Sequence, residues 1–140
     1  MEAFDLDRFV DAQAGIYAQA LAELRAGRKQ SHWMWFVFPQ IAGLGRSPTA
    51  RFYAIASAAE ARAYLAHPLL GPRLRECAEI LLAHAGRSAE AIFGGVDAIK
   101  LRSSMTLFEA VADRPKPFSA VLDTYFDAER DAATMALLDG

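Results

Sequence analysis

The sequence is short of the features that mark several large classes of protein. Cys77 is its only cysteine, so the chain can form no internal disulfide and carries no cysteine-based metal motif. No apolar run approaches the ~20 residues that a helix needs to cross a bilayer. The first residues, MEAFDLDRFV, lack the basic start and the apolar stretch of a secretory signal. We therefore expect a cytoplasmic protein that makes no membrane contact.

Charge and histidine content give equally few signals. The 15 basic and 17 acidic side chains leave a formal net charge of −2, which provides no overall electrostatic reason to bind nucleic acid. The three histidines do not have the spacing of metal ligands. The sequence therefore predicts no metal site, and none of its motifs requires a cofactor.

What the chain does contain is apolar residues at helical spacing. Its 140 residues are 54% hydrophobic, which is enough for one domain to bury a core without disulfides or metals. Apolar residues recur at steps of three and four from Phe9 to Leu24, a pattern that predicts one amphipathic helix ending at Gly27. We predict a compact, mostly all-α, multihelical single domain over residues 1–140.

Capping and breaking residues place the other helices. The run HWMWFVF, residues 32–38, is too short for periodicity to separate a strand from a buried helix, so a short extended segment near Trp33–Phe38 stays open. The remaining helices are expected from Ala58 to Ala66, from Pro68 to Gly86, from Ser88 to Phe93, from Asp97 past Phe108, from Ser119 to Phe126, and from Asp131 to Leu138.

The stretch GRKQSHWMWFVFPQIAGLGRSPTARFY, residues 27–53, combines positive charge with aromatic rings. Basic and hydroxyl residues precede the aromatic run, and Arg46 and Ser47 follow a Gly-Leu-Gly loop. If the run doubles back, the two basic clusters converge, and glycine amides and arginine are suited to binding phosphate. Trp33 would then stack on a flat ring. The predicted ligand-binding residues here are Lys29, Ser31, Trp33, Gln40, Gly43, Gly45, Arg46 and Ser47.

A plainer interpretation of the same stretch stands beside this one. Aromatic residues in a short apolar run usually belong to the core, and we assign Trp35, Phe36 and Phe38 to it by preference. The basic loop residues fit a solvated loop and a ligand site equally well. His32 titrates near neutral pH and is a candidate acid or base, although such a histidine more often fills a polar gap.

A second candidate stretch is DAIKLRSSMTLFE, residues 97–109. On a helix, Asp97, Lys100 and Ser104 share one stripe beside the apolar one. A desolvated Lys100 could act as a base with Asp97 as its partner. The structural alternative is an N-cap aspartate in an ordinary helix ion pair. Ser103 and Ser104 are poor helix formers in mid-helix, and either ligand binding or helix packing would explain them.

Three blocks of the sequence together resemble a known family. AGRKQSHWMWFVFPQIAGLGRS, YAIASAAEARAYLAHPLLGPRLRE and DAIKLRSSMTLF resemble, in this order, the blocks of the domain-of-unknown-function 1810 family. The resemblance covers nearly the whole chain and implies a compact, mostly helical domain, but no activity, because the family is uncharacterised. The positions on the first and last blocks are Lys29, Ser31, His32, Trp33, Trp35, Pro39, Gln40, Gly43, Gly45, Ser47, Asp97, Lys100, Ser103, Ser104, Met105 and Thr106.

Two functional hypotheses follow. In the first, the protein binds, and in an enzymatic version hydrolyses, a phosphorylated nucleotide-derived ligand of the ADP-ribose kind, with Lys100, Asp97 and His32 as candidate catalytic residues. Helical hydrolases of ADP-ribose compounds are similar in parts, since they also combine tryptophan, lysine and aspartate on a small helical scaffold. The alternative is a non-catalytic protein-interaction module, such as a homodimer. The first hypothesis requires Arg46 and Lys100 to share one pocket.

Overall fold

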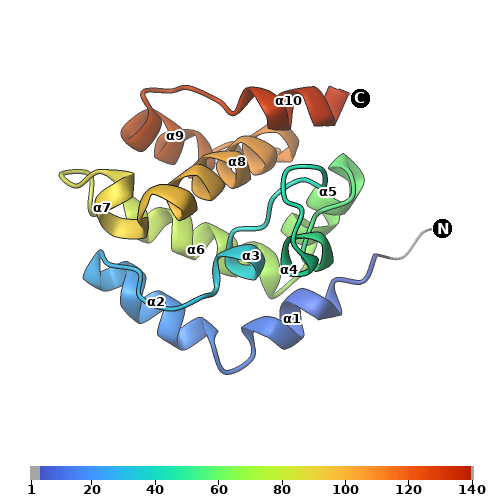
Figure 1. Ribbon diagram of the computed structural model, residues 1–140, viewed down its shortest axis with the longest axis horizontal. Coiled ribbons are helices and arrows are strands. Elements are labelled where there is room, and N and C mark those ends of the chain that lie inside the picture. The colour runs from blue at the N-terminus through green and yellow to red at the C-terminus, as the bar shows by residue number, and fades with distance from the viewer. Residues whose placement is uncertain (1–3, 140) are drawn as a thin grey trace.

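The computed structural model describes residues 4–139 and confirms the all-α prediction, because its regular secondary structure consists of ten helices (Figure 1). The helices are α1 (Asp7–Gln13), α2 (Tyr17–Ala26), α3 (Met34–Val37), α4 (Pro48–Phe52), α5 (Ala58–Ala66), α6 (Leu70–Leu82), α7 (Ala89–Phe93), α8 (Gly95–Val111), α9 (Phe118–Phe126) and α10 (Ala132–Asp139).

The long helix α8 is the centre of the arrangement. It packs against α5, α7, α9 and α10, while α6 packs against α2, α5 and α9, and α1 packs against α3. Figure 1 shows α9 and α10 on one side of α8 and the first two helices on the other. The buried apolar side chains of these helices form one continuous core, as expected of a chain of this size.

Aromatic rings connect the layers of this core. Phe9 of α1 lies 5.1 Å from Tyr64 of α5, centroid to centroid, and Tyr64 lies 5.3 Å from Phe108 of α8. Phe108 in turn lies 6.0 Å from Phe118 of α9. All four side chains are fully buried, and such ring pairs stabilise a fold by about 0.5–1.5 kcal/mol beyond their area burial.

Three predicted helix starts are confirmed by their hydrogen bonds. The Ser57 hydroxyl accepts from the Glu60 amide at 3.2 Å, and Ser88 caps α7 in the same way. The Asp131 carboxylate accepts from the Thr134 amide at 3.1 Å and begins α10. Each of these caps satisfies an amide that the helix itself leaves free.

The first predicted helix is wrong as a single element. It is two helices, because Gly15 has a φ of 78°, a left-handed conformation that no α-helix contains. The end at Gly27 is as predicted, with a φ of 72°. The break turns α2 away from α1, and both stretches still bury their apolar faces.

The extended segment left open near Trp33–Phe38 is a short helix. Trp33, Met34, Val37 and Phe38 are buried, at the three- and four-residue spacing of a helix rather than the alternation of a strand. Extended pairing within the described residues is limited to one isolated parallel bridge between Ile41 and Ile55.

Several predicted boundaries differ from those observed. α8 begins at Gly95, so Asp97 lies in its first turn and is not its N-cap. α9 begins at Phe118, so Ser119 lies inside the helix. α6 begins two residues after Pro68 and ends at Leu82. These helix ends differ from the predicted ones by a few residues because several polar residues or prolines near each end could begin or end the helix.

The helices α5 and α6 meet at a close backbone contact. A Cβ added at Gly71 would lie 2.1 Å from the Leu65 carbonyl oxygen, so a side chain at this position would collide with the backbone of α5. Only glycine therefore allows the two helices to approach this closely.

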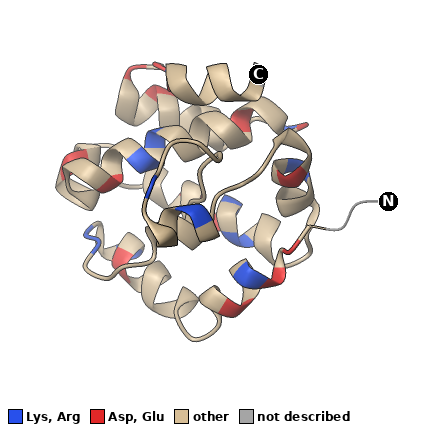
Figure 2. Cartoon of the chain, turned by 45° about the vertical axis from the view of Figure 1, so that its right-hand side comes forward, with Lys and Arg blue, Asp and Glu red and all other residues tan. Residues whose placement is uncertain are grey.

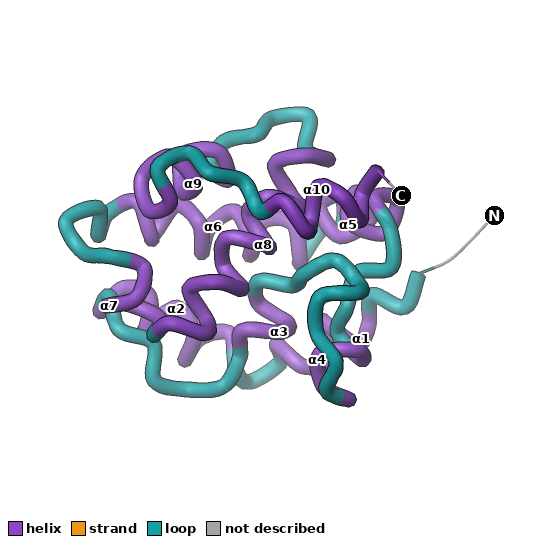
Figure 3. Tube along the Cα trace, turned by 45° about the horizontal axis from the view of Figure 1, so that its top comes forward, coloured by secondary structure: helices purple, strands orange, loops and turns teal. Residues whose placement is uncertain are grey.

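The loop between α3 and α4 brings the 27–53 stretch beside the last helices. Figure 3 shows this loop passing next to α8 and α10. Basic and acidic residues are spread over the helices and loops (Figure 2). Within residues 4–139, no helix combines the length and the apolar character that a membrane span requires.

Candidate functional site

A cavity of about 470 Å³ lies between the 35–50 segment, α8 and the start of α10. We call it the Trp35 cavity. Because α8 brings its first three turns alongside the loop after α3, residues far apart in the sequence face the same space. The lining residues are Trp35, Gln40, Leu44, Gly45, Arg46, Ser47, Ala50, Val96, Ile99, Lys100, Ser103, Asp131 and Ala133.

Behind the cavity wall runs a chain of ion pairs. Lys29 Nζ lies 2.8 Å from Asp97 Oδ2, and Lys100 Nζ lies 3.4 Å from Asp97 Oδ1. The Lys29 side chain is 6% exposed, whereas those of Asp97 and Lys100 are 21% and 19% exposed. One carboxylate thus faces two ammonium groups, and the group of three carries a net positive charge. Burial strengthens such charge-assisted contacts.

Each lysine of this chain also lies over a tryptophan ring. Lys29 Nζ lies 5.0 Å from the Trp33 ring centroid, and Lys100 Nζ lies 4.0 Å from that of Trp35. Both distances are within the range of cation–π attraction. The contacts therefore connect the buried Trp33 ring, Lys29, Asp97, Lys100 and the Trp35 ring at the cavity, in that order.

Glu23, near the end of α2, holds the segment that carries Lys29. Its buried carboxylate accepts from the amides of Gln30 and Ser31 at 2.7 and 2.9 Å and from Trp33 Nε1 at 3.0 Å. Burial raises the pKa of Glu23, but the hydrogen bonds, that of the Ser31 hydroxyl foremost, outweigh burial and bring the pKa to about 2. The carboxylate therefore stays charged and fixes the chain between α2 and α3.

The other side of the cavity is held by Asp131. Its Oδ2 lies 3.2 Å from the Ser103 hydroxyl of α8, and its backbone amide donates to Thr106 Oγ1 at 3.0 Å. Thr134 Oγ1 donates to the same carboxylate oxygen. Ser103 and Thr106 therefore have a hydrogen-bond partner in Asp131, just before α10, which accounts for two of the hydroxyl residues in mid-helix.

The structure brings together most of the residues singled out from the sequence. Six of them line the Trp35 cavity: Gln40, Gly45, Arg46, Ser47, Lys100 and Ser103. Lys29 and Asp97 stand behind Lys100 in the ion-pair chain, and Ser31 belongs to the Glu23 hydrogen bonds. Arg46 and Lys100 thus share one pocket, as the first hypothesis requires.

Other predicted site residues are placed elsewhere. Trp33 is fully buried and its ring has no face free for a ligand, so the expectation that it stacks is wrong for this structure. His32 is exposed and, like Gly43, is not among the lining residues. Ser104 is fully buried and away from the cavity, and its hydroxyl has no hydrogen-bond partner among the described residues.

Trp35 and Asp131 line the cavity, but they were not named as site residues from the sequence. Trp35 was assigned to the core with Phe38, but it is half-buried whereas Phe38 is fully buried. A helical reading of residues 33–38 would have found it, since Trp35 lies off the buried face. Asp131 was recognised only as a cap, and no sequence signal ties it to α8.

The cavity offers no metal ligands in a suitable group. Within residues 4–139 there is no cluster of three or more histidine, cysteine, aspartate or glutamate side chains able to hold a metal ion. Cys77 is buried in α6, and burial raises the pKa of its thiol to about 12. Besides apolar side chains, the Gln40 amide and the Asp131 carboxylate, the cavity presents two cations, two hydroxyls and one indole, a set suited to anion and ring binding.

The fold and the cavity define a class of small all-α domain with a cationic, tryptophan-walled pocket. The chain belongs to the DUF1810 family, described as a protein of unknown function, whose model matches residues 3–138. It is similar to the conserved hypothetical protein Rv1873 from Mycobacterium tuberculosis, with 54% sequence identity, a TM-score of 0.97 and 99% of each chain covered. No curated protein matches the chain.

Proposed function

We propose that the Trp35 cavity binds a small phosphorylated ligand that carries a flat aromatic ring, of the ADP-ribose kind. The observation that supports this most is the convergence of Arg46, Lys100 and Trp35 on one cavity. A guanidinium and an ammonium beside an indole supply the two interactions that such a ligand needs, which are phosphate pairing and ring stacking.

The charges around the cavity favour an anion. Lys29, Lys100 and Arg46 are opposed by the carboxylates of Asp97 and Asp131. The Asp131 carboxylate is already engaged by Ser103 and Thr134. Arg46 is exposed and makes no ion pair within residues 4–139. Its five donors are therefore available for a phosphate, and a guanidinium can bind phosphate through two of them at once.

Lys100 lies next to the Trp35 ring, so the proposed phosphate site and the proposed ring site are adjacent. Its ammonium lies 4.0 Å from the Trp35 ring centroid, so a phosphate bound by Lys100 lies beside the indole. A ligand whose phosphate is joined to a base through a sugar can contact both groups. The apolar side chains of Leu44 and Ile99 complete the lining on either side and suit the rest of a ring system.

In the hydrolytic version of the proposal, Lys100 neutralises charge on the leaving group. Both carboxylate oxygens of Asp97 face ammonium groups, so Asp97 positions the lysines and is poorly placed to accept a proton as a base. Hydrolysis of ADP-ribose by water gives AMP and ribose 5-phosphate and develops negative charge on the departing phosphate, so chromatography of these products tests this version separately. Ligand binding without any product would restrict the function to binding.

Thermal-shift measurements with ADP-ribose, AMP, adenosine and inorganic phosphate test the binding proposal. A ligand present at 100 times its dissociation constant adds about 2.7 kcal/mol of stability, which for a domain of this size raises Tm by on the order of 10 °C. We expect shifts from ADP-ribose and AMP that exceed those from adenosine and phosphate, because only the former combine ring and phosphate.

Matched variants locate the effect. Lys100→Met and Trp35→Leu should each abolish most of the shift, whereas Lys116→Met, which makes the same change of charge outside the cavity, should retain it. Equal responses of the two methionine variants, or a flat response of the wild type to all four compounds at millimolar concentration, would exclude the proposal.

A second candidate function is a protein-interaction module, and a specific observation favours it. Val96 and Ile99 at the mouth of the cavity are 70% and 66% exposed, although large apolar side chains usually avoid water. The aromatic stretch itself is not the surface, because Trp33 and Phe38 are fully buried. Sedimentation of the wild type and of a Val96→Glu/Ile99→Glu variant tests for a homodimer, which only the wild type should form.

A further inference from the structure

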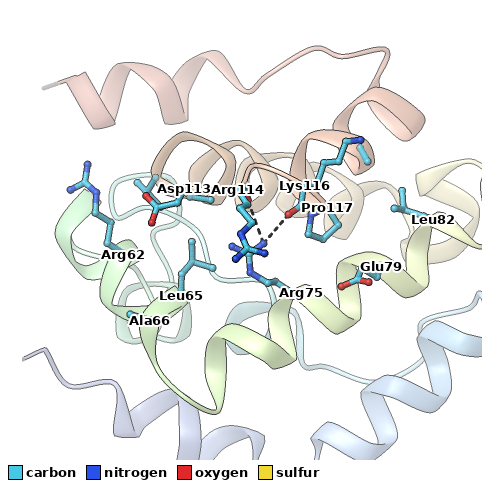
Figure 4. A pocket seen from close by; sticks show the side chains of 13 residues that line it. Arg62, Leu65, Ala66, Arg75, Glu79, Leu82, Asp113, Arg114, Lys116 and Pro117 are labelled. Atoms are coloured by element: carbon cyan, nitrogen blue, oxygen red, sulfur yellow. Dashed lines mark hydrogen bonds between the residues drawn. The ribbon is translucent and has the colours of Figure 1, made fainter.

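A second cavity, with a volume of about 910 Å³, is a groove on another part of the surface. Its walls come from α5, α6, the end of α8, the loop after α8 and the start of α9 (Figure 4). We call it the 62–117 groove. No predicted site residue lines it. The lining residues are Arg62, Leu65, Ala66, Arg75, Glu79, Leu82, Val111, Ala112, Asp113, Arg114, Lys116, Pro117 and Ala120.

The groove concentrates positive charge on a chain whose net charge is −2. Four of its lining side chains are cationic and two, Glu79 and Asp113, are acidic. None of these six makes an ion pair within residues 4–139. This differs from the Trp35 cavity, where the lysines are paired with Asp97. The cations of the groove thus lack internal counter-charges and can take them from a partner.

One of the four cations is held in place. Arg75 of α6 reaches across the groove and donates through Nη1 to the carbonyls of Lys116, at 2.8 Å, and Arg114, at 3.4 Å (Figure 4). Its guanidinium also lies 5.1 Å from the Phe118 ring centroid. The loop that carries Arg114 and Lys116 is therefore fixed against α6 before a partner binds, which lowers the ordering cost of association.

The remaining lining favours one class of partner. Between the cations lie aliphatic side chains, among them Leu65, Leu82 and Val111, and no aromatic ring or histidine lines the groove. Single-stranded nucleic acids are usually bound by base stacking on aromatic rings, so the groove lacks what they need. A peptide that alternates carboxylates with aliphatic side chains matches both the spaced cations and the apolar surface between them.

We propose that the 62–117 groove binds an acidic, aliphatic-rich peptide segment of a partner protein. The carboxylates of the segment pair with Arg62, Arg114 and Lys116, and its aliphatic side chains cover the floor between α5 and α8. This surface is independent of the Trp35 cavity, because the two share no lining residue.

Selection from a random dodecapeptide library displayed on phage tests the proposal with the full chain as bait. We expect enrichment of peptides rich in aspartate, glutamate and leucine. The binding of an enriched peptide, measured by fluorescence polarisation, should weaken by at least about tenfold in Arg62→Glu/Arg114→Glu, since each reversed charge loses an attraction and gains a repulsion.

The control variant is Arg28→Glu/Arg51→Glu, which makes the same change in net charge at exposed residues outside the groove. It should bind the peptide as the wild type does, and the ADP-ribose shift should be unchanged in Arg62→Glu/Arg114→Glu. The proposal is overturned by a lack of enrichment, by enrichment of basic or aromatic peptides, by equal weakening in the two double variants, or by oligothymidylate binding more tightly than the peptide.

Discussion

The Trp35 cavity and the 62–117 groove differ in how most of their cations are held, although Arg46 of the cavity is also exposed and unpaired within the described residues. In the cavity, Lys29 and Lys100 are paired with Asp97 and each lies over an indole, so their positions are determined within the fold. In the groove, Arg62 and Arg114 are exposed and unpaired within the described residues. Charges paired within the fold select a ligand by shape, whereas unpaired charges attract a partner of opposite charge.

The two regions also differ in what supports them. The cavity wall depends on buried groups, since Trp33 and Glu23 lie in the interior behind it. The groove depends on one partly exposed arginine, Arg75, which ties the loop after α8 to α6. We therefore expect substitutions behind the cavity to cost far more stability than substitutions in the groove.

The largest expected effect is that of removing the buried indole. Trp33→Ala should lower the free energy of unfolding by about 3–5 kcal/mol, because it deletes a fully buried aromatic side chain and leaves a cavity. Trp35→Ala, at a half-buried ring, should cost less than about 2 kcal/mol. Urea unfolding of both variants measures the difference, and equal costs would mean that the two rings are equally buried.

A smaller effect, with a pH signature, is expected at Glu23. Its pKa is held at about 2, below the ordinary 4.5, so the ionised carboxylate contributes stability above pH 4.5 and that contribution is lost as the pH falls toward 2. Glu23→Gln should therefore be less stable than the wild type by on the order of 2 kcal/mol near neutral pH. The gap should close during acidification. Urea unfolding across this range measures it, and a gap independent of pH would contradict the assigned pKa.

The smallest expected effect is in the groove. Arg75→Met keeps the apolar stem but removes the donors to the Lys116 and Arg114 carbonyls, and should cost about 1 kcal/mol. Hydrogen exchange of the amides in residues 112–117 should quicken, while that of α2 should not change. A loss as large as that of Trp33→Ala would show that the groove loop belongs to the cooperative core.

The sequence was sufficient for the all-α fold because its helices carry strong local signals. The serine caps at Ser57 and Ser88 act within one turn, and the apolar periodicity of α6 and α8 is long. The prediction was wrong at Gly15 and left α3 undecided, because a single backbone angle determines the first and only four residues form the second. Neither feature extends over enough residues to show a period.

Six of the residues that line the Trp35 cavity were singled out from the sequence, but their organisation was not. Basic and aromatic residues marked both stretches, and the structure joins them through the contact of Lys29 with Asp97. That contact depends on how the segment between α2 and α3 lies against the first turn of α8, which no local pattern encodes. The groove was missed for the same reason, since Arg62, Arg75 and Arg114 come from three elements and each alone resembles an ordinary surface arginine.

The glycine at the junction of α5 and α6 has a consequence for recognition. Because Gly71 lets the backbone of α6 approach the Leu65 carbonyl oxygen, it influences how far Arg62 of α5 lies from Arg114, whose loop is held by Arg75 of α6. The absence of a side chain at Gly71 thus affects the distance between two guanidinium groups. A bulkier residue at position 71 would change the spacing of the carboxylates that the 62–117 groove can bind.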